Sequence, residues 1–209
     1  KTILSKLYHW KIYVVGSVEY QYPNHLFQAG YFLDKKYYDE NTIDFKHLLL
    51  SEKNQSLLKD IQNSNSVGVH IRRGDYMTKQ NLVIFGNICT QKYYHDAIRI
   101  ITEKVNDAVF YVFSDDISWV QTHLDIPNAV YVNWNTGESS IYDMYLMSSC
   151  KYNIIANSTF SYWAARLNKK TNMVIYPSKW YNTFTPDIFP ESWLSLIHIS
   201  EPTRLGMIS

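Results

Sequence analysis

The chain has 209 residues, 46% of them hydrophobic and 19% charged, and its 20 Lys and Arg against 19 Asp and Glu give a formal net charge of +1. This composition excludes a disordered tail or a coiled coil, and the near-neutral charge argues against a nucleic-acid binder that depends on bulk positive charge. Cys89 and Cys150 are too few for a disulfide framework and lack zinc-site spacing. There is no run of about 18 apolar residues, so the sequence predicts no membrane-spanning helix.

The first part of the chain differs in character from the rest. Residues 1–44 are dense in aromatic side chains, which serve either as core or as platforms for sugar rings, and only residues 12–18 look strand-like. Residues 45–62 have the spacing of a helix with one apolar face. A polar stretch follows at residues 63–65, and we place a domain boundary there, between residues 1–63 and 64–193.

The C-terminal segment, residues 194–209, reads LSLIHISEPTRLGMIS. This string resembles a translated sequencing adapter, so we expect a non-native tail and set it aside from fold reasoning. The alternative is a short natural strand and turn.

From residue 66 onward, apolar runs of strand length alternate with segments of helical spacing. We predict strands at 66–71, 108–113, 129–133, 152–156 and 173–176, and helices at 90–105, 114–124, 139–149 and 159–167. Strands that alternate with helices in this way predict an α/β fold with a parallel sheet and right-handed crossovers. Ligands of such sheets bind beyond the carboxyl ends of the strands, so candidate functional residues are those just after each strand.

The first of these strands leads into the sequence HIRRGDY at residues 70–76. Two guanidiniums suit a diphosphate because arginine offers planar pairs of donors to phosphate oxygens, and Gly74 allows a close backbone approach. Strand alternation puts His70 and Arg72 on one face and Arg73 on the other, so we expect the two arginines to have different roles.

Asp75 in the same segment is suited to orient an arginine or to accept a proton from a sugar hydroxyl. Two other interpretations stay open for these residues. One is a surface salt-bridge cluster, and the other is an RGD adhesion tripeptide at residues 73–75, although such a tripeptide acts from an exposed loop tip.

The second strand ends in Ser114, Asp115 and Asp116. The ordinary interpretation of this segment is a helix N-cap with acids favourably placed on the helix dipole. The two aspartates are adjacent, so they lack the intervening residue of a DxD metal signature.

The third site combines Asp143 with the segment that follows the strand at 152–156, where Ser158, Thr159 and Phe160 open a helix. Small hydroxyls at a helix N-terminus either serve as caps alone or form an anion site with backbone N–H groups and the helix dipole. Residues 157–159 also read as a glycosylation sequon, which their position at a buried strand end disfavours.

Taken in order, HIRRGDY, YVFSDD and DMYLMSSCKYNIIANSTFSYWAARL resemble the three motifs of glycosyltransferase family 11, the α-1,2-fucosyltransferases, in their bacterial form. The upstream QAGYFLDKKYY is also similar to a segment of this family, and the resemblance covers about residues 22–181. It implies a two-domain B-type glycosyltransferase, with a Rossmann-like donor domain at 64–193 and the remainder of an N-terminal acceptor-side domain and a linking helix at 1–63. The glycine-rich N-terminal loop of the family has no match, so we expect a truncated and inactive chain.

The resemblance implies transfer of L-fucose from GDP-β-L-fucose to the 2-hydroxyl of a terminal galactose, with inversion and without a metal or other cofactor. It assigns donor binding to Arg72, Arg73, Asp143, Ser158, Thr159 and Phe160. Within this set Arg72 would bind the β-phosphate, and Asp143 would accept from the guanine N1–H and N2–H₂ groups. His70 and Asp75 match supporting neighbours and are candidates for the general base, but a base outside this sequence is equally open.

The alternatives are a fucosyltransferase of another linkage, α-1,6 or protein O-linked, and a non-catalytic nucleotide-sugar-binding or adhesion module. The expected partners are GDP-fucose and a galactose-terminated glycan, not nucleic acid. The abundance of Asn, Ile, Tyr and Lys suggests a bacterial source. We therefore expect a cytoplasmic location at the inner membrane, where lipopolysaccharide is built, which leaves peripheral membrane association open.

Overall fold

The computed structural model describes residues 13–15, 27–29 and 45–196. The chain divides into two compact units, one of residues 1–43 with Pro186–Ile188 and one of residues 44–185 with 189–209. In the first unit, β1 (Tyr13–Val15) and β2 (Phe27–Ala29) pair in parallel. The predicted strand at 12–18 contains β1, whereas β2 was not predicted.

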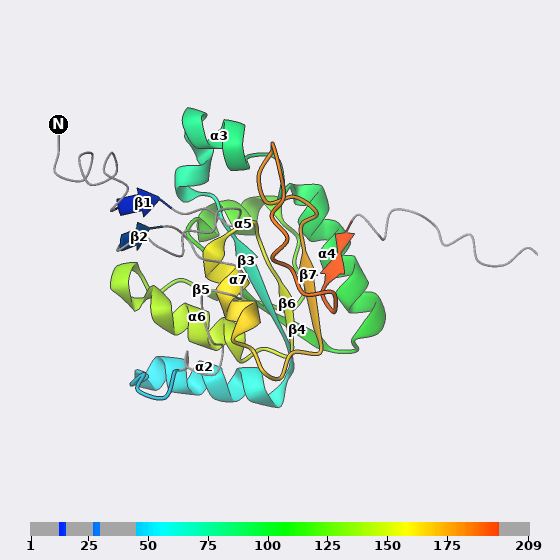
Figure 1. Ribbon diagram of the computed structural model, residues 1–209. Helices are drawn as coiled ribbons and strands as arrows, with labels where there is room; N and C mark the ends of the chain where they lie inside the picture. Colours follow the sequence, from blue (N-terminus) through cyan, green and yellow to red (C-terminus); the bar gives the residue numbers. More distant parts are fainter. Residues whose placement is uncertain (1–12, 16–26, 30–44, 197–209) are drawn as a thin grey trace, which may run out of the picture. The chain divides into compact units, whose positions relative to one another are not determined.

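The second unit is built on a parallel six-stranded sheet with the strand order β5-β4-β3-β6-β7-β8 (Figure 1). The predicted α/β class is therefore confirmed, and every strand predicted after residue 65 is present. The bounds are β3 (Asn65–Ile71), β4 (Ala108–Ser114), β5 (Ala129–Val132), β6 (Tyr152–Ile154), β7 (Met173–Tyr176) and β8 (Leu194–Ser195).

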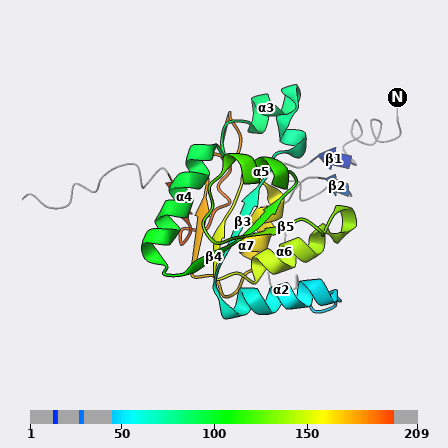
Figure 2. The ribbon, with the colours of Figure 1, turned by 180° about the vertical axis from the view of Figure 1, so that it is seen from behind.

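Helices cover both faces of this sheet (Figures 1 and 2). They are α2 (Glu52–Asn63), α3 (Lys79–Phe85), α4 (Gln91–Lys104), α5 (Ile117–His123), α6 (Ser140–Ser148) and α7 (Thr159–Arg166), with 3₁₀ turns η2 (Gly74–Met77) and η3 (Gly137–Ser139). One hydrophobic core joins α4 and α5 to the sheet, and a second joins α2, α6 and α7 to its other face. No helix among the described residues is long and apolar enough to cross a membrane.

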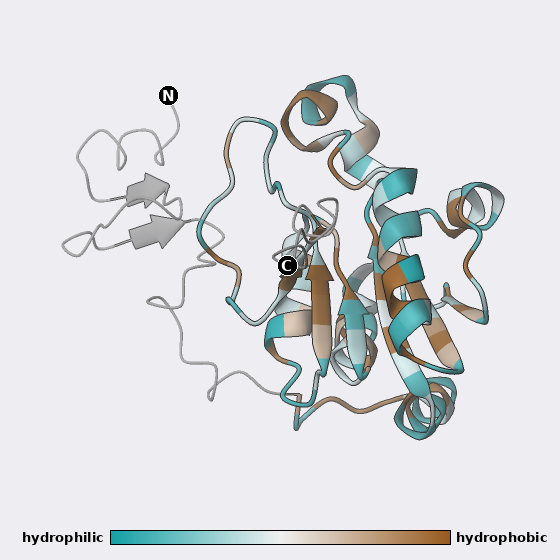
Figure 3. Ribbon diagram, turned by 90° about the vertical axis from the view of Figure 1, so that its right-hand side faces the viewer, coloured by the Kyte–Doolittle hydropathy of each residue, from teal (hydrophilic) through white to brown (hydrophobic). Residues whose placement is uncertain are grey.

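Strand β3 lies at the centre of the sheet because its sequence suits burial on both faces. Val67, Val69 and Ile71 enter the core under α4, and Figure 3 shows that helix with hydrophobic and hydrophilic residues in alternating bands. On the opposite face Gly68 lets α6 approach closely, since a Cβ there would lie 2.9 Å from Asn153 Nδ2 and 3.0 Å from Met147 Cγ. This two-sided packing fixes the direction in which the end of β3 points.

The structure differs from the predicted first domain and from the predicted helix at 45–62. The division of the chain falls between residues 43 and 44, not 63 and 64. Helix α2 begins only after Ser51, whose side chain caps it by accepting from Asn54 N at 3.3 Å. Its Leu57 and Ile61 lie in the same core as α6 and α7, so the predicted linking helix packs with the second unit.

Besides β2 and the two 3₁₀ turns, α3 and β8 were not predicted from the sequence. Helix α3 has no buried residue, so it lacks the apolar face that sequence periodicity detects. Strand β8 lies within residues 194–209, which we set aside as a tail, and pairs Leu194 with Ile175 and Ser195 with Tyr176. The sheet therefore has a sixth strand, while residues 197–209 lie outside the described part of the chain.

Candidate functional site

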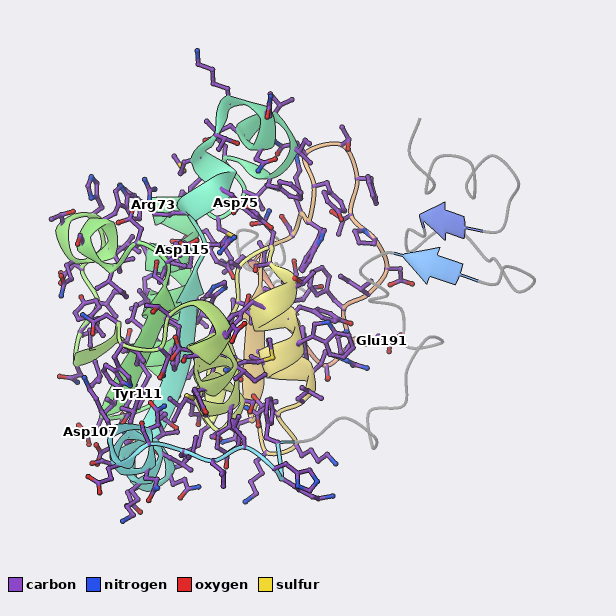
Figure 4. All side chains as sticks on the ribbon, turned by 90° about the vertical axis from the view of Figure 1, so that its left-hand side faces the viewer. Arg73, Asp75, Asp107, Tyr111, Asp115 and Glu191 are labelled. Atoms are coloured by element: carbon purple, nitrogen blue, oxygen red, sulfur yellow. The ribbon has the colours of Figure 1, made fainter. Side chains whose placement is uncertain are left out.

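The predicted functional segments meet at the carboxyl edge of the sheet. β3 and β4 pair in register up to Ile71 opposite Ser114, so the segments that follow them emerge side by side. Figure 4 shows Arg73, Asp75 and Asp115 together at this end of the sheet, and Asp107, which precedes β4, at the other. Parallel strands thus bring together residues that are more than 40 positions apart in the sequence.

Arg72 is held by carboxylates from two different segments. Its Nη2 donates to Asp75 Oδ1 at 2.6 Å, and its Nη1 lies 2.8 Å from Asp115 Oδ2. The other oxygen of Asp115 accepts from the backbone N–H of Arg73 at 2.9 Å. Asp115 therefore fixes both the guanidinium of Arg72 and the chain just after it.

Arg73 points to different partners. Its Nε donates to Asp116 Oδ2 at 3.2 Å, and its guanidinium carbon lies 3.7 Å from the ring centroid of Trp119. The different roles expected for the two arginines are matched by these different surroundings. Because Arg73 is bound in this way and only 19% of its side chain is exposed, residues 73–75 are not displayed as an adhesion tripeptide.

The helix-cap interpretation of the second motif holds for two of its three residues. Asp116 is the N-cap of α5 and accepts from Trp119 N at 3.1 Å, while Ser114 Oγ accepts from Asp116 N at 3.0 Å. Asp115 instead binds Arg72. The sequence analysis did not connect these two residues, because the pairing depends on the register of β3 with β4.

The structure explains the glycine at position 74 differently from our prediction. We expected it to admit a diphosphate, but the space beside it is filled by a protein carboxylate. A Cβ at position 74 would lie 2.5 Å from Asp115 Oδ2. The glycine therefore permits the close approach of Asp115 that holds Arg72.

A cavity of about 640 Å³ opens beside this cluster and takes in much of the predicted donor site. Its lining includes His70, Arg72, Asp115, Asp143 and Phe160. Ser158 and Thr159 are not among the described residues that line it. They lie at the first turn of α7, immediately before Phe160.

The N-terminus of α7 has no side-chain cap from its N-cap residue. Ser158 is the N-cap residue, is buried, and makes no capping hydrogen bond through its side chain. The cap-only interpretation of this segment is therefore wrong. The sequon interpretation also fails, as expected, because Asn157 is buried and its amide donates to the carbonyls of Phe85 and Trp180.

His70 lies in the cavity wall as a neutral imidazole. Its ring centroid is 4.8 Å from that of Phe160, and its Nδ1 is buried without a hydrogen-bond partner in the described structure. Burial, reinforced by the charge of Arg72, lowers the pKa of His70 from 6.5 to about 3. Such an environment disfavours the imidazolium, so His70 is poorly suited to act as the general base.

Burial also shifts the pKa of Asp143, which lines the same cavity. Burial raises the pKa of this carboxyl from 3.8 to about 7, against the opposing effect of a hydrogen bond from Asn135. That bond, from Asn135 Nδ2 to Asp143 Oδ1, is 2.6 Å long. Asp143 is thus a partly desolvated carboxyl in the wall of the cavity, with one fixed donor.

A small polar network that the sequence analysis missed positions Asp143. Asn54 of α2 and Asn135 exchange two side-chain hydrogen bonds of 3.0 Å, and Trp134 Nε1 donates to Asn54 Oδ1 at 2.7 Å. Asn54 is 1% exposed. The available signal was a polar residue in the apolar stripe of α2, three positions before Leu57 and seven before Ile61.

A parallel sheet that carries phosphate-binding residue types beside a cavity at its carboxyl edge is typical of α/β proteins that bind nucleotides. The comparison with known proteins narrows this class. The family model for glycosyl transferase family 11 matches residues 8–196. The chain belongs to glycosyltransferase family 11.

Similar proteins include two bacterial transferases. An α-1,2-colitosyltransferase of Escherichia coli is 35% identical over 196 residues, which cover 87% of this chain and 63% of the relative. The O-antigen biosynthesis glycosyltransferase WbnK of Escherichia coli is 41% identical over 65% of this chain and 46% of its own length. The chain therefore spans about half to two thirds of these curated relatives.

More distant similarity extends to animal enzymes and to solved structures. Galactoside α-(1,2)-fucosyltransferase 2 of Pongo pygmaeus is 29% identical over 58% of this chain and 37% of its own. The crystal structure of the α-1,6-fucosyltransferase NodZ soaked with GDP-fucose is 18% identical and covers 59% of this chain and 44% of its own. Its TM-score of 0.40 is too low to support an argument from shared structure.

We predict that Gly74→Ala lowers the free energy of unfolding by about 1–3 kcal/mol, because the new Cβ overpacks the Asp115 carboxylate. In an Asp115→Ala background the nearest remaining atom is the Asp115 Cβ at 3.9 Å, so the same change should cost much less. Urea unfolding of the four proteins in this double-mutant cycle measures the coupling. Additive effects would contradict the role assigned to Gly74.

Proposed function

We propose that this chain is part of a glycosyltransferase that moves L-fucose from GDP-β-L-fucose to the 2-hydroxyl of a terminal galactose with inversion. One observation carries the proposal: a cavity of about 640 Å³ is lined by Arg72 and by the partly buried Asp143. Those groups suit a diphosphate and a guanine, respectively. Family membership and the fucosyl- and colitosyltransferase relatives support the same reaction class.

Asp143 would select the guanine base. An ionised carboxylate accepts two hydrogen bonds, from N1–H and N2–H₂, whereas adenine offers no such pair of donors. The amide of Asn135 would keep the carboxylate in place, since its own position is fixed by Asn54.

Arg72 would hold the β-phosphate, but only after a change of partners. The two guanidiniums of Arg72 and Arg73 face the carboxylates of Asp75, Asp115 and Asp116, so the cluster carries one more negative than positive charge. A diphosphate entering this cluster must displace a carboxylate. The side chain of Asp75 is 57% exposed, whereas that of Asp115 is 26% exposed and also bound by Arg73 N. We therefore assign the exchange to Asp75.

This exchange would give Asp75 its catalytic task. Once phosphate replaces it on Nη2 of Arg72, its carboxylate is free to accept the proton of the acceptor hydroxyl as that oxygen attacks the anomeric carbon. The bond from the anomeric carbon to the phosphate oxygen breaks, and GDP leaves with the electron pair. Arg72 and the N–H groups at the start of α7 would stabilise the departing charge without a metal.

The wider setting is also proposed. The unit of residues 1–43 would belong to the acceptor-side half of a B-type glycosyltransferase, and the unit that begins at residue 44 would be its donor domain. Escherichia coli WbnK, by its name an O-antigen biosynthesis enzyme, supports a role in lipopolysaccharide assembly. The proposed location is the cytoplasmic face of a bacterial inner membrane, with peripheral association. The relative that transfers colitose makes GDP-colitose a second candidate donor. A panel of both donors with galactosides, followed by linkage analysis of the product, tests these assignments.

We predict that Arg72→Ala weakens GDP binding at least about tenfold, because a charged hydrogen bond to phosphate contributes about 1.5–3 kcal/mol. Isothermal titration calorimetry of the chain with GDP measures this loss. Arg99→Ala is the matched control, since Arg99 is an exposed arginine of α4 whose ion-pair partner among the described residues is Glu103. Equal affinities of Arg72→Ala and wild type would refute the proposed phosphate site.

For Asp75→Asn we expect opposite changes in binding and turnover. GDP affinity of the chain should stay equal or rise, because the asparagine competes less for Arg72. The rate of transfer, measured in a full-length family member with the same substitution, should fall by about 10²–10⁴-fold with the loss of the base. Asp115→Asn should instead weaken GDP binding, since it releases Arg72 and the backbone of Arg73. Loss of GDP affinity in Asp75→Asn would contradict the exchange.

The raised pKa of Asp143 predicts a pH-dependent affinity for GDP. Guanine requires the carboxylate, and the free site holds a proton below its pKa of about 7. GDP affinity should therefore rise with pH up to about 7 and level off above it, with a slope approaching tenfold per pH unit at acidic pH. In Asp143→Asn this component should vanish, leaving only the titration of the phosphate itself. Identical pH profiles for the two proteins would exclude Asp143 as the guanine-binding group.

A further inference from the structure

A second cavity, of about 400 Å³, lies at the same edge of the sheet, on the other face of β3. Ile71 and Arg73 line this cavity, whereas His70 lines the donor cavity, as strand alternation requires. Arg72 lines both. A molecule in the second cavity would therefore lie next to the group that holds the diphosphate in the proposed function.

The wall of this cavity is held in place by contacts between η2, α3 and two loops, although α3 is short. The ring of Tyr76 stacks on that of Phe85 with centroids 4.6 Å apart, and its hydroxyl donates to Asn157 O at 2.9 Å. From the other side, Asn182 N donates to Ile84 O at 2.8 Å. These contacts tie η2 and α3 to the loops that follow β6 and β7, so the cavity has a fixed shape.

The polar groups of the cavity suit hydroxyls better than an anion. The Nε of Arg73 donates to Asp116 and the guanidinium lies over Trp119, while no described residue accepts from its two Nη groups. Their N–H groups are therefore free to donate to a ligand. Every cation of the wall already has a carboxylate: Arg72 has Asp75 and Asp115, Arg73 has Asp116, and Lys92 has Asp96 at 2.6 Å. The carboxylates of Arg73 and Lys92 are held more firmly than Asp75, because Asp116 also accepts from Trp119 N and the side chain of Asp96 is only 28% exposed. A phosphate or an acidic sugar therefore has no readily displaced carboxylate at these two cations.

The remaining lining combines apolar side chains with amides. Ile71, Met77, Leu82 and Phe85 form an apolar part, and Asn87 and Gln91 supply amide groups at exposed positions. A sugar ring matches this pattern, because it has apolar C–H groups on its ring and hydroxyls around its rim. The volume is within the range of about 300–1,000 Å³ typical of small-molecule sites.

We propose that this second cavity binds the acceptor, as an uncharged galactopyranoside, with Arg73 as its main hydrogen-bond donor. The assignment rests on the proposed function, which supplies the donor on the other side of Arg72. It separates the two substrates by the two faces of one strand: His70 faces the nucleotide, and Arg73 faces the sugar. Arg72, at the boundary, would contact the phosphate where the two substrates meet.

The test uses the chain saturated with GDP and titrated with methyl β-D-galactopyranoside, with binding followed by saturation-transfer NMR. Met77→Trp and Gln91→Trp fill the cavity from opposite walls, and both positions are exposed enough to accept the larger ring without unfolding. We expect each to weaken galactoside binding at least tenfold and to change GDP affinity less than twofold. Val83→Trp on α3 and His95→Trp on α4 are matched controls that do not line the cavity and should leave both affinities unchanged.

Two results would overturn the inference while leaving the proposed function intact. One is galactoside affinity that is equal in wild type and in both cavity-filling variants while GDP still binds. The other is binding of methyl galacturonate in place of the uncharged galactoside, which would show that the wall selects an anion. Failure of the wild-type chain to bind GDP would instead refute the proposed function itself.

Discussion

The site depends on the interaction between Arg72 and Asp115. Arg72 follows β3 and Asp115 follows β4, and the in-register pairing of these strands places Asp115 Oδ2 2.8 Å from Arg72 Nη1. The same carboxylate binds the backbone N–H of Arg73, and only a glycine at position 74 leaves room for it. The guanidinium is therefore positioned by the sheet, through a second motif that has no need to contact a ligand.

This interaction also explains why the site lies between two cavities. Residues that alternate along β3 face opposite sides of the sheet, and the chain leaves the strand at the point where α4 and α5 cover one face and α6 and α7 the other. His70 consequently joins Phe160 and the α7 side, while Arg73 joins Trp119 of α5. Arg72 lies at the carboxyl edge of the sheet and lines the cavities on both faces of β3. A bend elsewhere in β3 would displace all three side chains together.

Much of this could be predicted from the sequence, and the failures have physical causes. Long apolar runs predicted the strands, and the three motifs predicted which strand ends matter. The partners of Arg72 and Asp143 could not be predicted, because they depend on strand register and on a buried asparagine of α2. Helix α3 was missed because none of its residues is buried, and β8 was set aside because residues 194–209 resemble a translated sequencing adapter. His70 was a candidate base until its burial showed that a charged form is disfavoured.

The carboxyls of the site are held in opposite ways, and this difference bears on the order of events. Asp143 is desolvated, with Asn135 as its donor, so a guanine that supplies two N–H groups would favour the ionised form. Asp75 is largely exposed and bound to Arg72, so a phosphate at Arg72 would release it. A donor that binds at both ends would thus fix one carboxylate and free the other. The carboxylate of Asp75 would be free beside Arg72 only after the nucleotide is in place. In that arrangement, proton acceptance from the sugar hydroxyl requires the donor to bind first, which disfavours an encounter in which the acceptor alone occupies an active site.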